Sequence, residues 1–423
     1  MFRRYIDTKL SAALGDTRVV LLHGARQTGK STLARQIAER ERREYLTLDD
    51  PAILGVARSD PWALVERAGE GIVIDEVQLA PQLFPAIKRA VDQDNRPGRF
   101  LLTGSANLFL LPNLSESLAG RIEILTLHPL SQSELASPQG GRPRAESRGA
   151  DENNFVEALF SADPWTMGRT DEPREAVCRR VIGGGFPEAV GREGARRDAW
   201  FGSYVTTLLQ RDVRDLMQIE GLTELPRLLS LLAARSSALL NASEIARALG
   251  LPNSTVRRYL ALLEALFLFQ PLPAWSTNFG KRLVKSPKAH LLDSGLAAHL
   301  RGETDARALA HSSSLGPLLE SFVVLELRKL LTWSRMAALP YHFRTTTGRE
   351  VDVVLESPDQ RVVGIEVKAA SNVGPGDFSG LQALREAAGE KFVRGAVLYL
   401  GEQRLPYGDG MWALPISTLW RPQ

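Results

Sequence analysis

The sequence predicts an α/β protein built from several domains, and three observations lead to this prediction. The N-terminal third contains short apolar runs that end in polar residues and alternate with helical stretches, as in a parallel sheet. Residues 222–275 lose this alternation and read as helices. Strands and helices alternate again after residue 316. A chain of 423 residues is long enough for about two to four domains.

The composition indicates a soluble globular chain. The net charge of +3 permits a nucleic-acid partner without requiring one. The single cysteine, Cys178, excludes an internal disulfide and suits a reducing compartment. No apolar run reaches the length of about 18 residues that a membrane-spanning helix needs, and the N-terminus does not resemble a signal peptide. We therefore expect a cytoplasmic protein with no membrane partner.

A glycine-rich loop follows the first predicted strand, residues 18–22, and leads directly into an amphipathic helix. The loop matches G-x-x-x-x-G-K-[ST] in the strand–loop–helix context that this pattern needs. Its residues are Gly24, Ala25, Arg26, Gln27, Thr28, Gly29, Lys30 and Ser31, and Thr32 follows them. Backbone N–H groups of such a loop cradle phosphates, Lys30 would contact the outer phosphates, and Ser31 would bind Mg²⁺. The loop predicts ATP and Mg²⁺ as ligands.

Two further strands end in residues suited to the same site. After the apolar run 71–74 come Asp75, which would hold Mg²⁺, and Glu76, which would orient and deprotonate the attacking water. A strand at 99–103 is followed by Ser105 and Asn107. In ATPases with this extra glutamate such a strand lies between the two nucleotide-binding strands, so either residue would sense the γ-phosphate. The alternative is a polar strand end that caps the next helix.

Several segments together resemble prokaryotic AAA+-type P-loop ATPases that carry a C-terminal domain of unknown function. The segments are HGARQTGKS, VIDEVQ, LTGSAN and SLAGR, followed by residues 184–188, 210–212 and 288–296. The resemblance covers nearly the whole chain. It implies a homo-oligomeric ATPase in which Arg121 or Arg211 serves as an arginine finger. From the residues alone, either arginine could equally be a surface or salt-bridge residue.

The middle of the chain predicts a winged helix. Helices at 225–234, 241–250 and 256–266, with a glycine-containing turn between the second and third, are typical of a helix-turn-helix, and residues 268–272 would form a wing strand. Asn253, Thr255, Arg257 and Arg258 would read DNA, with added positive charge from Lys281, Arg282, Lys285 and Lys288. The alternative is a winged helix that makes an intramolecular or subunit contact.

The C-terminal pattern is a helix, three strands, a helix and a strand, which is the order of the PD-(D/E)xK nuclease fold. The elements are expected at 318–331, 341–345, 350–356, 362–368, 376–388 and 396–400. Asp352 and Glu366 would bind Mg²⁺, Glu320 would be an outer ligand, and Lys368 would position the attacking water. The alternative is that these acids form a solvated sheet face paired with Lys368.

The sequence thus predicts a multidomain ATPase. The expected segments are a P-loop ATPase core (1–135), an insert with a short helix (136–175), a helical lid-like segment (176–221), a winged helix (222–275) and a restriction-nuclease-like α/β domain (276–423). ATP hydrolysis would couple to the winged helix and the nuclease-like domain, acting on nucleic acid, DNA above all, with Mg²⁺-dependent nuclease activity as a further possibility. The competing hypothesis is a nucleotide-switched scaffold or sensor whose nuclease-like domain is inactive and only binds.

Overall fold

The computed structural model describes residues 2–66, 71–105, 118–137, 154–162, 165–216 and 224–421, without the side chains of 211–216, Phe279 and Lys281. These residues form two compact units. The N-terminal unit comprises residues 3–130 and 262–268, and the C-terminal unit comprises 1–2, 131–261 and 269–423. The predicted multidomain α/β class is confirmed. Asn107, the side chain of Arg211 and residues 138–153 of the predicted insert lie outside the described residues.

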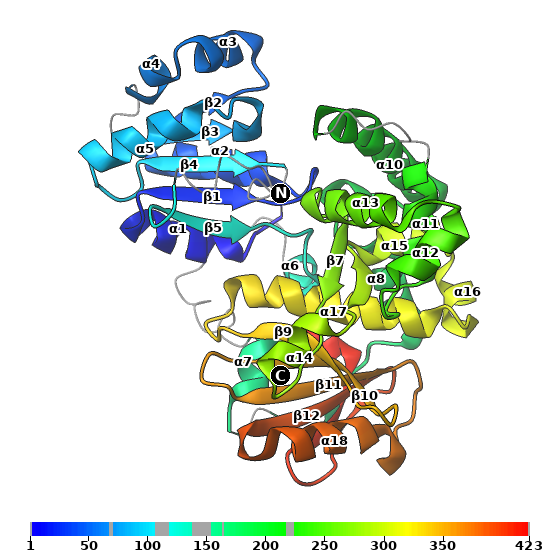
Figure 1. Ribbon diagram of the computed structural model, residues 1–423. Helices are drawn as coiled ribbons and strands as arrows, with labels where there is room; N and C mark the ends of the chain where they lie inside the picture. The colour runs from blue at the N-terminus through cyan, green and yellow to red at the C-terminus, as the bar shows by residue number, and fades with distance from the viewer. Residues whose placement is uncertain are drawn as a thin grey trace. The chain divides into compact units, whose positions relative to one another are not determined.

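The N-terminal unit contains a sheet of five parallel strands in the order β2-β3-β4-β1-β5 (Figure 1). The strands are β1 (Val19–His23), β2 (Glu44–Thr47), β3 (Ile72–Asp75), β4 (Phe100–Gly104) and β5 (Ile122–Thr126). β4 pairs with both β1 and β3, as expected for the strand that precedes Ser105. Because all five strands are parallel, their carboxyl ends lie along one edge.

Helices cover both faces of this sheet. They are α1 (Ile6–Asp16), α2 (Lys30–Glu41), α3 (Pro51–Ser59), α4 (Pro61–Glu66) and α5 (Leu83–Gln93), and a short 3₁₀ turn spans Val77–Leu79. Val20 and Leu22 pack with α1 and α2 in one core cluster. Val19 and Leu21 pack with α4 and α5 in the other. The alternation of side chains along β1 therefore explains why its whole run is apolar: both faces are buried.

The first part of the C-terminal unit is mainly helical. Its elements are α6 (Gln132–Ala136), α7 (Phe155–Phe160), β6 (Gly168–Arg169), α8 (Arg174–Gly183), α9 (Pro187–Val190), α10 (Gly194–Leu216), α11 (Leu225–Ala234), α12 (Ala242–Leu249), α13 (Asn253–Ala265), β7 (Phe269–Leu272), α14 (Phe279–Val284), β8 (Lys288–Leu291), α15 (Ser294–Leu300) and α16 (Ala306–His311). β7 and β8 pair antiparallel, with Leu272 opposite Lys288. A domain boundary at 275/276 would separate these two strands.

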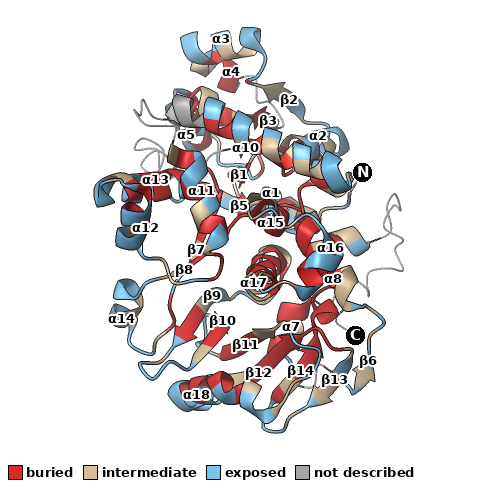
Figure 2. Cartoon of the chain, turned by 90° about the vertical axis from the view of Figure 1, so that its right-hand side faces the viewer, coloured by how far each residue is buried: buried red, intermediate tan, exposed pale blue. Residues whose placement is uncertain are grey.

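A seven-stranded mixed sheet forms the rest of the C-terminal unit, in the order β6-β13-β14-β12-β11-β10-β9. Its further elements are α17 (Leu315–Trp333), β9 (Leu339–Arg344), β10 (Glu350–Glu356), β11 (Val362–Lys368), α18 (Ser379–Ala388), β12 (Phe392–Tyr399), β13 (Gln403–Pro406) and β14 (Met411–Pro415). The six predicted elements are present in the expected order, and β13 and β14 were not predicted. α17 is buried over most of its length (Figure 2). Among the described residues, no helix is both long and apolar enough to cross a membrane.

Close packing of α18 on β10 generates a prediction. A Cβ on Gly380 would lie 1.9 Å from the carbonyl oxygen of Glu350, so alanine would push the helix off the sheet. We expect Gly380→Ala to destabilise the C-terminal unit by about 1–3 kcal/mol, the usual cost of overpacking. Gly376→Ala is the matched control, because a Cβ there meets nothing within 4 Å. Calorimetric melting tests this, and equal melting temperatures for the two variants would contradict it.

Candidate functional site

The glycine-rich loop connects β1 to α2 in the geometry that phosphate binding requires. Gly24 and Gly29 have φ of 152° and 95°, which favour glycine. A Cβ on Gly24 would lie 2.2 Å from the carbonyl oxygen of Leu127, so close backbone packing also requires glycine there. Gly29 is the N-cap of α2 and offers no side-chain cap. The first N–H groups of α2 therefore remain available to an anion, which the helix dipole also favours.

Hydrogen bonds within the N-terminal unit fix the loop. Lys30 Nζ and Thr28 Oγ1 both donate to the carbonyl oxygen of Ala25, at 2.8 and 2.9 Å. Arg4 donates to the carbonyl oxygens of Thr28 and His128, both at 2.7 Å. Arg4 thus ties the loop to the segment after β5. It was not predicted, because no local motif links an arginine near the N-terminus to this loop.

Ser31 and Asp75 converge as a Mg²⁺ site requires. Ser31 Oγ donates to Asp75 Oδ1 at 3.1 Å, and Tyr45 donates to Asp75 Oδ2 at 2.6 Å. Thr103, from β4, also donates to Asp75. Burial and the hydrogen bond to Asp75 raise the pKa of Tyr45, so its hydroxyl keeps its proton. A hydroxyl oxygen beside a carboxylate is the donor set that Mg²⁺ prefers, so these residues fit the ion.

Glu76 occupies a strained backbone conformation next to a polar network. Its φ of 57° is uncommon for a residue with a side chain and carries a cost of about 1–3 kcal/mol. Gln78 donates to the carboxylate of Glu76 and, at 3.0 Å, to Ser105 Oγ. The two predicted residues are therefore connected through Gln78, which was not predicted. Ser105 is buried, and Thr32 lies exposed on the first turn of α2.

His23, the last residue of β1, adds no positive charge to the loop. Burial and the nearby charge of Lys30 lower its pKa to about 4, so the ring is neutral at pH 7. Its Nε2 lies 2.8 Å from Thr126 Oγ1. Its ring packs edge-on against the ring of Phe267, with 5.0 Å between the ring centroids. Phe267 follows α13, and residues 262–268 belong to the N-terminal unit. The end of α13 therefore packs beside the residue that precedes the loop.

Arg121, one of the two arginine-finger candidates, pairs with Asp92 within the same unit. The Nε–Oδ1 distance is 2.5 Å, and the Arg121 side chain is 29% exposed. This is the salt-bridge arrangement that the sequence left open as an alternative. A role for either arginine in a neighbouring subunit stays a prediction.

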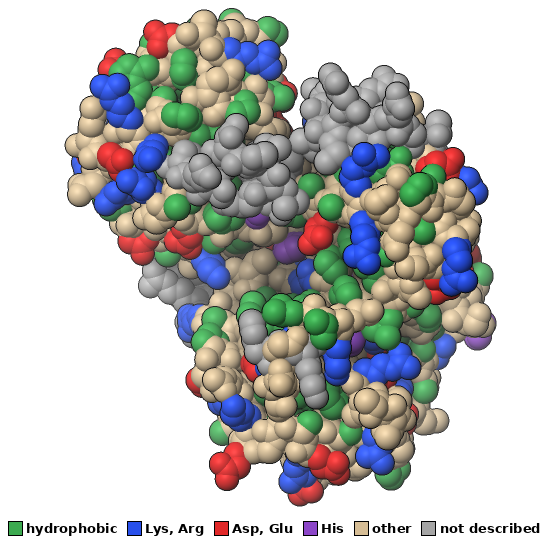
Figure 3. Space-filling model, in the orientation of Figure 1, with side chains coloured by type: hydrophobic (Ala, Val, Ile, Leu, Met, Phe, Trp, Pro, Cys, Tyr) green, Lys and Arg blue, Asp and Glu red, His purple; other side chains and the backbone are tan. Residues whose placement is uncertain are grey.

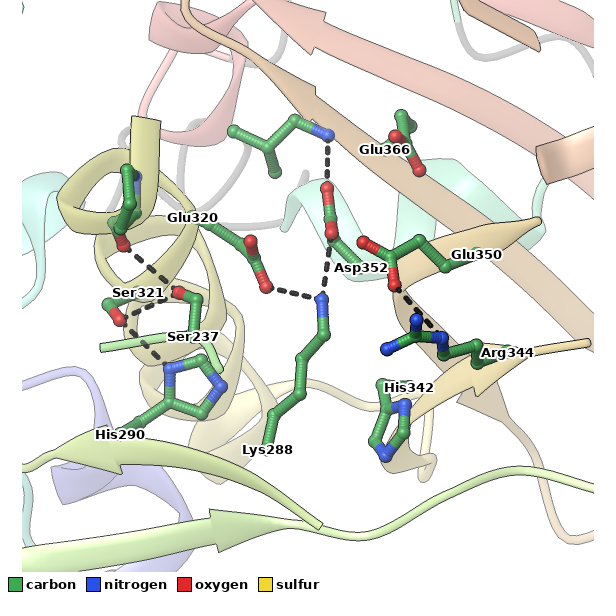
Figure 4. A network of polar contacts seen from close by, with 12 residues as sticks. Ser237, Lys288, His290, Glu320, Ser321, His342, Arg344, Glu350, Asp352 and Glu366 are labelled. Atoms are coloured by element: carbon green, nitrogen blue, oxygen red, sulfur yellow. Dashed lines mark hydrogen bonds and ion pairs between the residues drawn. The ribbon is translucent and has the colours of Figure 1, made fainter. Parts of the chain in front are cut away.

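In the C-terminal unit, a lysine lies between two of the predicted metal ligands (Figure 4). Lys288 Nζ is 2.6 Å from Glu320 Oε1 and 2.9 Å from Asp352 Oδ1. The other oxygen of Asp352 accepts a hydrogen bond from the backbone N–H of Val367 at 2.9 Å. Glu366 pairs with Lys368 at 2.9 Å. We call Glu320, Asp352 and Glu366 the carboxylate cluster.

The lysine corrects one expectation about surface charge. Lys288 was counted among the basic residues near the winged helix, but it is only 4% exposed and is neutralised by two acids. Arg282 likewise pairs with Glu356, at 2.5 Å. Two of the four additional positive charges are therefore held by acids of the same unit. The sequence could not reveal this, because these partners are distant along the chain.

Burial dominates the electrostatics of the carboxylate cluster. Burial, and then repulsion by Asp352, raise the pKa of Glu366 to about 8 and that of Glu320 well above its usual value. Burial opposes the charge of Lys288, but Asp352 and Glu320 outweigh it and raise the pKa of Lys288. As positioned, the described residues include no group of three His, Cys, Asp or Glu that could hold a metal ion. The cluster as it stands therefore fits an ammonium group better than Mg²⁺.

The candidate DNA-reading residues lie near the start of α13. Arg257 and Arg258 are exposed, and Thr255 is half-buried. Asn253 Nδ2 donates to Ser243 Oγ of α12 at 2.9 Å, so this side chain contacts the preceding helix. Only the two arginines therefore present an exposed positive charge on this stretch.

Comparisons with known proteins identify the family. An uncharacterized protein of Mycobacterium tuberculosis, Rv2008c, is 31% identical over 420 residues, which cover 99% of this chain and 84% of the relative. The chain belongs to the same family. Mb2031c of Mycobacterium bovis, also described as uncharacterized, matches with the same values.

Three family models match separate parts of this family member. Residues 16–136 match an AAA domain. Residues 174–307 and 315–419 match two domains of unknown function, DUF8612 and DUF4143. Together with the loop and its parallel sheet, the first match shows that the N-terminal part is an AAA-type P-loop ATPase domain.

Solved structures show weaker likeness. The Walker-type ATPase PABY2304 of Pyrococcus abyssi is 16% identical, with 71% of this chain and 96% of that chain covered and a TM-score of 0.43. The Holliday junction branch migration motor RuvB of Thermotoga maritima is 18% identical, with 63% and 89% covered and a TM-score of 0.28. Both TM-scores are too low to support a detailed correspondence.

The packing at Gly24 predicts a loss of nucleotide binding on substitution. In Gly24→Ala the loop must move away from Leu127, which would displace its N–H groups. Because strain of about 1–3 kcal/mol is typical of such a change, we expect ATP affinity to fall about tenfold to a hundredfold. Gly55→Ala is the control, since a Cβ there meets nothing within 4 Å. Titration calorimetry with ATP measures both, and unchanged affinity in Gly24→Ala would contradict the assignment.

Proposed function

We propose that this protein hydrolyses ATP in the N-terminal unit and uses the nucleotide state to control a helix-turn-helix and a nuclease-like module that bind nucleic acid. The observation that carries the ATPase part is the convergence of the loop, Ser31 and Asp75 at the carboxyl ends of the parallel strands β1 and β3, which flank β4. The positions of Glu76 and Ser105 next to them support it further.

In the proposed mechanism, the loop N–H groups and Lys30 bind the β- and γ-phosphates. Ser31 and Asp75 would hold Mg²⁺, which would supply charge neutralisation at the phosphate oxygens. Glu76 orients a water molecule and takes its proton as the water oxygen bonds to the γ-phosphorus. The bond between that phosphorus and the β–γ bridging oxygen then breaks, and ADP and phosphate leave. Ser105 senses the γ-phosphate from the end of β4.

Coupling to the rest of the chain is supported by the end of α13. The side chain of Phe267 packs on His23, which immediately precedes the loop. The exposed Arg257 and Arg258 lie in the first half of α13, the helix that Phe267 follows. A change in the loop on ATP binding would therefore reach the helix that we propose contacts DNA. Homo-oligomerisation, with Arg121 or Arg211 completing a neighbour's site, forms part of the same proposal.

Removal of the base tests the hydrolytic step. Glu76→Gln keeps the side-chain shape but cannot accept the proton, so ATP binding should persist while kcat falls about 10²–10⁴-fold. Glu44→Gln is the control, because Glu44 is exposed at the start of β2 in the same unit. Phosphate release and ATP binding are measured in parallel. Hydrolysis at the wild-type rate in Glu76→Gln would assign the base elsewhere.

The proposal that α13 contacts DNA depends on only two exposed positive charges near the start of this helix, those of Arg257 and Arg258. On the face seen in Figure 3, basic side chains are interspersed with acidic ones instead of forming one large patch. The proposal is therefore limited to a few phosphate contacts made by Arg257 and Arg258. A winged helix used only for contacts within or between chains remains the competing function.

Salt dependence separates these two functions. Replacing Arg257 and Arg258 by alanine should weaken binding to duplex DNA and reduce the slope of log affinity against log salt by about 1 for each lost phosphate contact. Arg307→Ala is the control, since Arg307 on α16 is 84% exposed. Fluorescence anisotropy at several salt concentrations measures the slope. An unchanged slope in the double variant would favour the protein-contact function.

For the nuclease-like module, binding is favoured over cleavage. Metal-dependent cleavage would need Asp352 and Glu366 free to share an ion, whereas Asp352 is occupied by Lys288 and Val367. We therefore favour a module that recognises a partner without cutting it, in line with the scaffold alternative.

A further inference from the structure

The carboxylate cluster is assembled from three elements and completed by a fourth. Glu320 comes from α17, Asp352 from β10 and Glu366 from β11, while the ammonium of Lys288 comes from β8 (Figure 4). Lys288 Nζ contacts an oxygen of Glu320 and an oxygen of Asp352 at hydrogen-bond distance. A single positive charge therefore lies at the point that two buried carboxylates share. A divalent cation would bind at the same point, because it needs oxygen ligands from several sides.

One carboxylate oxygen of the cluster, in the described part of the chain, has no hydrogen-bond partner. Glu366 is 7% exposed, and within the described part of the chain its Oε2 is buried without a hydrogen-bond partner. Its other oxygen pairs with Lys368. A buried carboxylate oxygen without a donor is costly, so this atom is a second and independent sign of a cation position.

The strand that carries Lys288 is joined by backbone hydrogen bonds to the connection between α11 and α12. Leu240 N–H donates to Pro287 at 2.8 Å, and Ser237 N–H donates to Ala289 at 2.9 Å. Ala289 N–H donates back to Ala238 at 2.9 Å. Ser237 Oγ also contacts Ser321 Oγ at 3.0 Å, beside Glu320 on α17. A displacement of β8 would therefore move residues 237–240, which lead into the helix-turn-helix.

We propose that Lys288 is a tethered cation that closes a divalent-cation position in the carboxylate cluster, so that the lysine fills this position at rest and a metal ion can enter only when β8 has moved away. Either charge relieves the repulsion among the three buried acids. Both cannot bind the same oxygens, because two cations in contact repel and the oxygens are few. By linkage, whatever draws the hairpin away would promote metal binding, and metal would release the hairpin to the same extent. Neither ATP hydrolysis nor nucleic acid is needed for this exchange.

Removal of the lysine should convert the cluster into a metal site. The experiment uses the full chain without nucleotide, and Mn²⁺ as the probe. In Lys288→Ala, Mn²⁺ at ten times its dissociation constant should raise the melting temperature by about 3–6 °C. The wild type should show no such rise, and adding Asp352→Asn to Lys288→Ala should abolish it. Mn²⁺ bound near Ser31 would affect all these proteins equally.

Lys285→Ala is the matched control, because Lys285 precedes β8 but is exposed, and its Nζ donates to the backbone oxygen of Arg344 at 3.3 Å instead of to a carboxylate. It should behave as the wild type. If Mn²⁺ raised the melting temperature of the wild type and of Lys288→Ala equally, Lys288 would not block a cation position and the proposal would be wrong. The absence of any effect in Lys288→Ala would show that the acids are no cation position.

A second measurement covers the case in which Lys288→Ala does not fold. Electron paramagnetic resonance counts the Mn²⁺ ions bound to the wild type and to Asp352→Asn. Lys288→Met, which keeps most of the side-chain length without the charge, is counted as well: one additional Mn²⁺ ion supports a position closed by Lys288, and the same count as in the wild type overturns it. A wild-type ion that Asp352→Asn removes would overturn the proposal, because the cluster would then bind metal with its lysine present.

Discussion

The insertion of β4 between β1 and β3 determines where the chemistry of the N-terminal unit can occur. Parallel pairing brings the ends of β1, β3 and β4 to one edge, so that Ser31, Asp75 and Ser105 gather although they are distant in sequence. Thr103 of β4 donates to Asp75 of β3, so the same order also fixes the carboxylate. The strained backbone of Glu76 depends on this support, since its N–H donates to Thr103 Oγ1 at 3.2 Å.

The sequence predicted those features that depend on residues close together along the chain. The loop is recognisable because its glycines and lysine occur at fixed spacing beside an apolar strand, and the C-terminal elements because strands and helices have different periods. Arg4, Gln78 and Lys288 were missed for a common reason. Each acts through contacts that only the tertiary fold creates, and an arginine, glutamine or lysine in isolation has no signature. For Lys288 the prediction was wrong: the lysine was expected to add positive charge to the surface, but it is buried and paired with two acids.

The two units treat buried charge in different ways. In the N-terminal unit, Asp75 is surrounded by hydroxyl donors from Ser31, Tyr45 and Thr103, which are neutral and leave its negative charge for an ion. In the C-terminal unit, the ammonium group of Lys288 already contacts both Asp352 and Glu320. The first arrangement suits a site that must take up and release Mg²⁺ with each nucleotide. The second suits a position that is filled at rest.

This difference bears on where the boundary of the C-terminal unit should be drawn. Lys288 reaches the cluster from β8, and β8 is held by β7 on one side and by residues 237–240 on the other. A fragment that begins at 276 would keep Lys288 but lose β7 and residues 237–240, leaving β8 as an unpaired strand beside three buried acids. Its behaviour toward metal would then reflect a loosened lysine and not the intact protein. The carboxylate cluster is therefore a property of the whole C-terminal unit, including the helices that precede the seven-stranded sheet.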